Sequence, residues 1–319
     1  MTWDYFVWLA DCDRLDETPT GGTLCGGFVD QVSKCFLEAE IERLEAEEVN
    51  DRNRRRQAED KKTQLRGEYM TKLSFGFPDE LYPGFHVDFS ALSSDSWLGL
   101  QLDFELLTPW YSRDDRVFHV MDNPVRKDRV FGVPFMAASS WKGMLRWAFQ
   151  MQMKLIGPEK EEDEEKRKQA RAWELHLFGN EKNEEKNFHQ GALAFYPTWF
   201  DRIGFEVINP HSRERRAGTQ PTYYEVVPPG SQGTLSLLYA PWPGMKPEAD
   251  PSEVFPKLLE AIEALLTTYG ISAKRTVGWG TAKILKWRAF HKENKSIEKE
   301  QRNVFEQEIK NWFAEGDPS

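Results

Sequence analysis

Apolar and polar residues alternate most clearly from Leu98 to Leu106. A period of two residues is that of a half-buried strand, so we expect a strand over 97–107. Shorter apolar runs predict further strands at 191–195, 204–208, 234–239 and 281–287.

Apolar residues at helical spacing predict two helices among these strands. The first runs from Ser140 to about Leu155, and Ser139 and Ser140 are residue types that cap helix starts. The second begins at Ser252 and carries an apolar face over 254–266. The order strand, helix, strands, helix, strand is that of a ferredoxin-like (RRM-like) α+β unit.

The N-terminal flank of this region is charged and helical in composition over 28–68. Its apolar stripe consists of Val29, Val32, Phe36, Leu37, Ile41 and Leu44. Beyond Val49 the pattern is almost wholly charged. Because the stripe is short, it favours a solvated helix or a helical hairpin held at one end over a partner-binding coiled coil.

Two further charged helices are expected, a solvated insertion over 159–172 and a C-terminal helix over 292–314. The predicted docking face of the C-terminal helix consists of Val304, Ile309, Trp312 and Phe313. These patterns suggest three parts, namely a helical extension with a linker (1–95), a core (96–290) and a C-terminal helix (291–319).

The net charge of the 319-residue chain is −10 at pH 7, which argues against indiscriminate nucleic-acid binding. The charge is uneven, however. Acids concentrate over 38–48 and 159–165, whereas 274–292 contains Lys and Arg but no acid. A basic groove on an acidic body is compatible with RNA binding in one defined place.

The sequence also indicates the cellular compartment in which we expect the protein. No apolar run reaches membrane-spanning length, and the N-terminus lacks the basic flank of a signal peptide, so we expect a cytoplasmic protein without a membrane partner. Cys12, Cys25 and Cys35 lack the spacing of a zinc site, and a reducing compartment is the simpler interpretation.

The segment 110–146 carries two motifs in succession, D-N-P-V-R-K-D at 122–128 and P-F-M-A-A-S-S-W-K-G-M-L-R at 134–146. L-F-G-N follows at 177–180, an Arg-rich block ending in A-G-T-Q-P follows at 213–221, and a basic Gly-rich loop occupies 270–280. In this order the blocks resemble the RAMP superfamily of CRISPR effector subunits, most closely the backbone subunits of type III complexes.

The resemblance covers about 97–290. It implies a ferredoxin-like core with a β-hairpin thumb around 203–230 and with helical insertions and extensions. The chain departs from the family at Ala137 and Ala138, where Pro and Gly are usual, so we expect the approach of a ligand to the backbone to differ there.

The predicted helix start is a candidate anion site, because its N–H groups and the positive end of the helix dipole attract phosphate. The candidate RNA-binding residues here are Ser139, Ser140, Lys142 and Arg146.

The loop at 270–280 is a second candidate. Its glycines, Gly278 and Gly280 among them, can simply supply positive φ and a tight turn. Together with Lys274, Arg275 and Trp279, they also offer N–H groups, cations and a stacking face, which suit a sugar-phosphate backbone with unpaired bases.

The predicted thumb contains Arg213, Arg215 and Arg216, which the resemblance implies press on the guide–target duplex. An ordinary exposed hairpin tip is the alternative. His211 is a candidate for guide processing with a histidine as general acid or base, although a lone loop histidine is more often incidental.

By resemblance, Asp122 falls on the position of the aspartate with which type III backbone subunits cut target RNA. A carboxylate there can hold Mg²⁺ or Mn²⁺, or accept a proton from the ribose 2′-hydroxyl. The alternative is a turn, since Asp-Asn-Pro reverses a chain without chemistry. Asp114 and Asp115 have a weaker claim, and Asp128 matches a residue that braces the loop.

The first hypothesis is therefore a crRNA-guide-binding subunit of a type III CRISPR effector in antiviral defence, and a candidate endoribonuclease that cuts target RNA through Asp122. Its expected partners are the crRNA guide, target RNA and other effector subunits. One alternative is a non-catalytic capping subunit of the same complex, and another is a guide-processing endoribonuclease that uses His211.

Overall fold

The computed structural model describes residues 25–72, 87–115, 119–128, 132–157, 163–180, 189–209, 221–292 and 295–315. The chain divides into two compact units, each assembled from separate stretches of sequence. The first unit comprises residues 1–83, 111–135 and 200–231, and the second comprises 84–110, 136–199 and 232–319. This division differs from the three consecutive parts that the sequence suggested.

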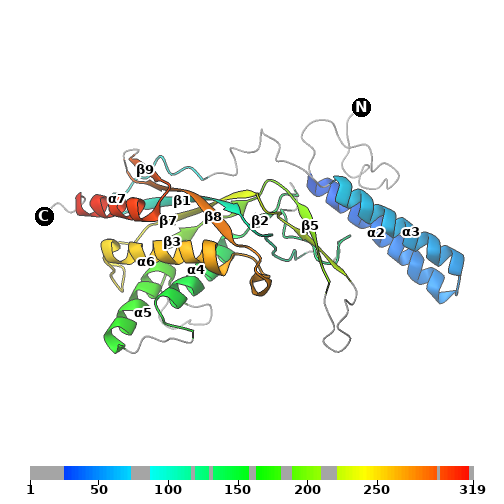
Figure 1. The fold of residues 1–319 in the computed structure, drawn as a ribbon, viewed down its shortest axis with the longest axis horizontal. Coiled ribbons are helices and arrows are strands. Elements are labelled where there is room, and N and C mark those ends of the chain that lie inside the picture. Colours follow the sequence, from blue (N-terminus) through cyan, green and yellow to red (C-terminus); the bar gives the residue numbers. More distant parts are fainter. Residues whose placement is uncertain are drawn as a thin grey trace. The chain divides into compact units, whose positions relative to one another are not determined.

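A five-stranded antiparallel sheet forms the centre of the second unit (Figure 1). Its spatial order is β3 (Leu193–Phe195), β7 (Gln232–Tyr239), β1 (Leu98–Leu106), β8 (Ala282–Phe290) and β9 (Ser296–Lys299). In sequence, α4 (Ala138–Gln152) follows β1 and α6 (Pro251–Ala264) follows β7. The first four strands and these two helices have the order of a ferredoxin-like unit, which confirms the predicted α+β fold class.

The central strand β1 lies where the alternation predicted it, but it is buried on both faces instead of one. Asp103 accepts hydrogen bonds from Arg288 Nη2 at 2.5 Å and from Thr234 Oγ1 at 2.8 Å. Gln101 Nε2 donates to the Val87 carbonyl at 2.7 Å. Gln101 and Asp103 thus find their partners on neighbouring strands and on the segment before β1, as a buried polar group requires.

Helices α4 and α6 lie on the same side of this sheet (Figure 1). Helix α6 begins where Ser252 predicted it, and Asp250 caps it by accepting a hydrogen bond from the Ser252 N–H at 2.8 Å. Its apolar face is buried as the spacing predicted, with Val254, Leu258, Leu259 and Ile262 among the buried residues. A π-helical turn, Leu265–Tyr269, then leads to the glycine-rich loop.

The charged insertion contains helix α5 (Glu164–Phe178), which Asp163 caps through the N–H groups of Glu165 and Lys166. Its first part is largely exposed, as expected of the solvated insertion over 159–172. In the last turns Glu174, His176 and Phe178 are buried. The insertion is thus attached to the unit by its C-terminal half.

The C-terminal region differs from the continuous helix expected over 292–314. Strand β9 comes first and extends the sheet at the edge of β8, and helix α7 (Arg302–Glu315) follows. Phe305 and Ile309 are buried in this helix, whereas Val304 is 45% exposed. The prediction of Ile309 as a docking residue is confirmed, and that of Val304 is wrong, because the helix presents the neighbouring position to the core.

The first unit contains a helical hairpin of α2 (Cys25–Glu48) and α3 (Arg52–Lys72), together with a β-hairpin of β5 (Gly204–Ile208) and β6 (Thr222–Val226). The β-hairpin lies in the segment predicted as a thumb. Two further strands contain two residues each, β2 (Phe135–Met136) and β4 (Thr198–Trp199).

The hairpin α2–α3 is the form that the short apolar stripe favoured, but the buried seam differs from that stripe. Val29, Val32, Phe36, Ala39 and Ala46 of α2 are buried, whereas Leu37, Ile41 and Leu44 are 41%, 47% and 48% exposed. The small alanines belong to the seam because they allow two helices to approach closely.

Cys35 is disulfide-bonded, which differs from the reducing compartment that the sequence suggested.

Within the described part of the chain, none of the helices combines the length and apolarity that a membrane span requires.

Candidate nucleic-acid interface

The start of α4 is the first candidate anion site. Its N-cap is Ala137 (φ −67°, ψ 148°), and no side chain caps the helix. The prediction that Ser139 and Ser140 are capping residues is therefore wrong, and both lie in the first turn, with Ser139 exposed. Without a capping side chain, the backbone N–H groups at this end remain suited to an external anion.

Lys142 lies half-buried in the next part of α4. Burial, followed by the nearby charge of Arg146, lowers the pKa of this lysine below its ordinary value. An anion beside Lys142 would offset both effects, since it favours the charged ammonium.

Arg146 serves the fold itself. Its Nε donates to Glu174 Oε1 at 2.8 Å, its Nη2 to the Gly179 carbonyl at 3.0 Å and its Nη1 to the Asn180 carbonyl at 3.3 Å. These bonds join α4 to the C-terminal end of α5. Because the guanidinium already has these protein partners, the proposed interface does not depend on Arg146.

The loop 270–280 needs its glycines for structural reasons. Gly280 has a φ of +90°, and a Cβ atom there would lie 2.3 Å from the Ser272 nitrogen. Gly270 has a φ of +78°, and its Cβ would lie 2.8 Å from the Trp279 carbonyl oxygen. The tight turn that the sequence offered as the simpler interpretation is present.

The same loop also presents the predicted cation and aromatic groups. Arg275 stacks on the Trp147 ring of α4, with its Cζ 4.5 Å from the ring centroid, and Trp147 in turn packs edge-on against Tyr269 at 4.9 Å. Lys274 and Trp279 are half-buried, and Gly278, in the left-handed conformation, is exposed. The cation–π contact thus holds the basic loop against the helix of the second motif.

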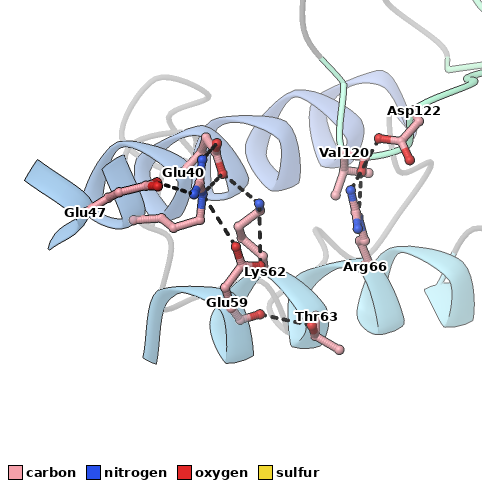
Figure 2. A network of polar contacts seen from close by, with 9 residues as sticks. Glu40, Glu47, Glu59, Lys62, Thr63, Arg66, Val120 and Asp122 are labelled. Carbon is pink, nitrogen blue, oxygen red and sulfur yellow. Dashed lines mark hydrogen bonds and ion pairs between the residues drawn. The ribbon is translucent and has the colours of Figure 1, made fainter. Parts of the chain in front are cut away.

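The loop that carries Asp122 belongs to the first unit and joins the β-hairpin. Asn123 Nδ2 donates to the Tyr223 carbonyl at 3.1 Å, and the Glu225 N–H donates to the Asn123 carbonyl at 3.0 Å. The Asp122 side chain is 68% exposed, and its Oδ1 lies 3.4 Å from Arg66 Nη2 of helix α3 (Figure 2). An exposed carboxylate on a firmly attached loop can meet a ligand from solvent.

A buried polar network that the sequence did not reveal lies at the base of this loop. Glu225 Oε2 pairs with Lys127 Nζ and accepts the Val125 N–H at 2.9 Å, and both ionic side chains are completely buried. Glu225 Oε1 accepts from the Tyr69 hydroxyl at 2.5 Å. The charge of Glu225 in the otherwise apolar run T-Y-Y-E-V-V was a signal of a buried partner, but it did not identify that partner.

His119 connects the same network to the backbone beside Asp122. Its Nδ1 accepts the Met121 N–H at 3.0 Å, and its Nε2 lies 3.0 Å from the Tyr69 hydroxyl. Because Nδ1 accepts, the neutral ring carries its proton on Nε2 and donates it to Tyr69, which donates onward to Glu225. Helix α3, the Asp122 loop and β6 are thereby connected.

The other acids near Asp122 differ in their surroundings. Asp114 is buried, and its Oδ2 accepts the Lys127 N–H at 3.2 Å, so it supports the loop backbone. The Asp128 backbone forms hydrogen bonds within 128–133, and Asp115 is exposed.

Among the described residues, no group of three or more His, Cys, Asp or Glu is arranged to hold a metal ion. A single exposed carboxylate still suits Mg²⁺ or Mn²⁺, since such ions are commonly bound by one or two carboxylates together with substrate phosphates. Asp122 is the residue that would hold the ion.

Four sequence candidates, His211, Arg213, Arg215 and Arg216, lie outside the described residues. The structure describes only the two strands that flank them.

Comparisons with known proteins agree with the sequence resemblance. A family model described as the RAMP superfamily matches residues 103–283. The chain is also similar to one in a solved structure titled "Cryo-EM structure of the Type III-B Cmr-beta bound to cognate target RNA", with a TM-score of 0.63 and 15% identity over 90% of this chain and 99% of the other. No curated protein matches. At this identity the structural likeness shows the fold.

Proposed function

Because the chain belongs to the RAMP superfamily, we propose that it is a guide-RNA-binding subunit of a type III CRISPR effector complex, with neighbouring subunits as its protein partners. The similar chain, of known structure, comes from a type III-B complex bound to target RNA, which supports this assignment. Antiviral defence is the corresponding biological role.

The observation that carries the proposal is the contact of Arg275 with Trp147. It holds the loop that bears Lys274 and Trp279 against the helix that bears Lys142. The uncapped start of α4, Lys142, Lys274 and the exposed Gly278 thus belong to one unit, on a helix and a loop that this contact joins. This combination suits the phosphates and unpaired bases of a guide RNA.

RNA affinity of the purified full chain, measured over a range of salt concentrations, tests the proposal. Lys142→Ala and Lys274→Ala should each weaken binding and make the negative slope of log K against log[salt] shallower by about 0.7, the value for one phosphate contact on a single strand. The matched control is Lys257→Ala, which removes the same charge from a lysine paired with Glu260 on α6. Equal slopes in the wild type, the two variants and the control would contradict the proposed interface.

We further propose that Asp122 supports cleavage of paired target RNA. Asp122 accepts the proton of a ribose 2′-hydroxyl, the 2′-oxygen attacks the adjacent phosphorus and the bond to the 5′-oxygen breaks. The departing 5′-oxygen takes a proton from water, and the products are a 2′,3′-cyclic phosphate and a 5′-hydroxyl. Mg²⁺ or Mn²⁺ bound at Asp122 would screen the negative charge of the phosphate.

Asp122→Ala separates this activity from scaffolding. If Asp122 is catalytic, the variant complex should lose metal-dependent cutting and keep its guide, because a carboxylate facing a phosphate contributes repulsion instead of affinity in the ground state. If Asp122 only shapes the turn, cutting should persist, with a loss of about 1 kcal/mol in the free energy of unfolding.

A second candidate function, a non-catalytic capping subunit, is favoured by the contact between Arg66 and Asp122. The contact gives one oxygen of the carboxylate a protein partner, as expected of a residue that shapes a loop. A wild-type complex that binds a complementary target with Mg²⁺ or Mn²⁺ present and never cuts it would establish this alternative.

A further inference from the structure

We propose that Arg66, on the N-terminal hairpin α2–α3, binds the phosphodiester of the RNA strand that lies at Asp122. The inference rests on the proposed function, in which target RNA reaches the Asp122 loop. It adds a binding residue from outside the segment 103–283 that the family model matches.

The guanidinium of Arg66 is held in place by three neighbours. Its Nε donates to the Val120 carbonyl at 3.2 Å, its Nη2 lies 3.4 Å from Asp122 Oδ1, and its Cζ lies 5.0 Å from the centroid of the Phe36 ring. Phe36 is buried, so this contact helps to hold the guanidinium in place. A charged group held in this way loses little entropy when it binds a ligand.

Arg66 nevertheless has N–H donors with which it can bind a ligand. Its side chain is 42% exposed, and within the described ranges Nη1 has no hydrogen-bond partner. The Asp122 contact at 3.4 Å is longer than a strong charge-assisted bond of about 2.7–2.9 Å. The other N–H donors of Arg66 thus lie beside the exposed carboxylate of Asp122 and can donate to a ligand.

Lys62, one turn earlier on the same helix, shows the contrast (Figure 2). It also approaches the Phe36 ring, at 5.2 Å, but its ammonium is paired with Glu40 at 2.6 Å and with Glu59 at 3.8 Å, and its side chain is only 14% exposed. Lys62 therefore holds the two helices together, whereas Arg66 points to the loop that carries Asp122.

The local charge explains why a cation is needed here. A phosphodiester placed close enough for Asp122 to act on the neighbouring 2′-hydroxyl would be repelled by the Asp122 carboxylate. The planar fork of an arginine offers two parallel N–H donors to phosphate oxygens and offsets this repulsion. Arg66 is the described residue whose guanidinium contacts Asp122.

Target-RNA binding to the guide-loaded complex tests the inference, with affinity measured at several salt concentrations and without divalent ions. Arg66→Ala should weaken target binding several-fold and make the negative slope of log K against log[salt] shallower by about 0.7–0.9, as expected for one lost phosphate contact. Arg66→Lys keeps the charge and should restore most of the slope. Asp122→Asn should strengthen target binding in a protein with Arg66, because it removes the repulsion.

The control is Lys62→Ala, which removes an equal charge from the same helix and should leave the salt slope unchanged even where it lowers the melting temperature. A purely structural role for Arg66 predicts the opposite pattern, with stability reduced in both Arg66 variants and the slope unaltered, and that result would overturn the inference. A wild-type complex that binds no target RNA would instead refute the proposed function on which it rests.

Discussion

Lys127 and Glu225 form an ion pair in which both side chains are completely buried, although 98 residues separate them in the sequence. The pair joins the loop after Asp122 to strand β6. Glu225 also receives the Val125 N–H and the Tyr69 hydroxyl, so its carboxylate is satisfied on both oxygens. The position of the Asp122 loop therefore depends on one buried carboxylate.

Removing either partner of this pair should be costly, and the two losses should not add. Lys127→Met and Glu225→Gln should each lower the free energy of unfolding by about 3–5 kcal/mol, because each variant leaves a buried polar or charged group without its partner. The double variant should cost less than the sum of the two. Denaturant unfolding of the wild type, the two single variants and the double variant measures the coupling energy between the two residues. Losses that simply add would contradict the prediction.

Tyr69→Phe tests the connection between the helical hairpin and the Asp122 loop. The Tyr69 hydroxyl forms hydrogen bonds with both Glu225 and His119. Its loss should therefore lower the free energy of unfolding by about 1–3 kcal/mol. Hydrogen exchange should then rise in α3 and in the backbone at 119–122. Tyr223→Phe, at a residue 44% exposed, is the matched control and should change neither quantity.

Arg146→Ala should act through stability. Glu174 is only 4% exposed at its side chain, and Arg146 is its shorter ionic contact, with Arg171 as the second. The loss of Arg146 should cost about 2–4 kcal/mol in unfolding free energy, and Glu174→Gln in the same chain should recover part of it. If the Arg146 variant instead keeps its melting temperature and loses RNA affinity, the structural role assigned to Arg146 is wrong.

His176 should make stability depend on pH. Burial lowers the pKa of His176 below its usual 6.5, only partly opposed by the bond to the Pro247 carbonyl. Since the unfolded state then binds the proton more readily, stability is fully present above pH 6.5 and is lost as pH falls from there through the lower folded pKa. Melting temperatures of wild type and His176→Gln between pH 7.5 and 5.5 should diverge most at the alkaline end. His291→Gln, at a half-buried histidine whose Nε2 lies 2.8 Å from the Asp95 carbonyl oxygen, is the control.

The uneven success of the sequence patterns follows from the range of the forces behind them. Local signals were reliable where the chemistry is confined to neighbouring residues. Helix α6, for example, begins at Pro251, next to the start predicted at Ser252, and its cap Asp250 accepts a backbone N–H only two residues away.

The same kind of signal failed where neighbours in space decide the outcome. Ser139 and Ser140 have the chemistry of N-caps, yet the backbone of Ala137 occupies that position. In α2, helical spacing alone cannot distinguish the exposed Ile41 from the buried Ala39, because the choice between them depends on where α3 packs.

The sequence by itself determined the order of strands and helices in the ferredoxin-like core, the family and the candidate aspartate, because hydrophobic period and short motifs are properties of neighbouring residues. Only the tertiary structure decided that Arg275 stacks on Trp147, that Arg66 reaches Asp122 and that Glu225 lies buried with Lys127. Each of these contacts joins residues far apart in the chain. Their distances depend on how whole elements pack, and no local pattern records that packing.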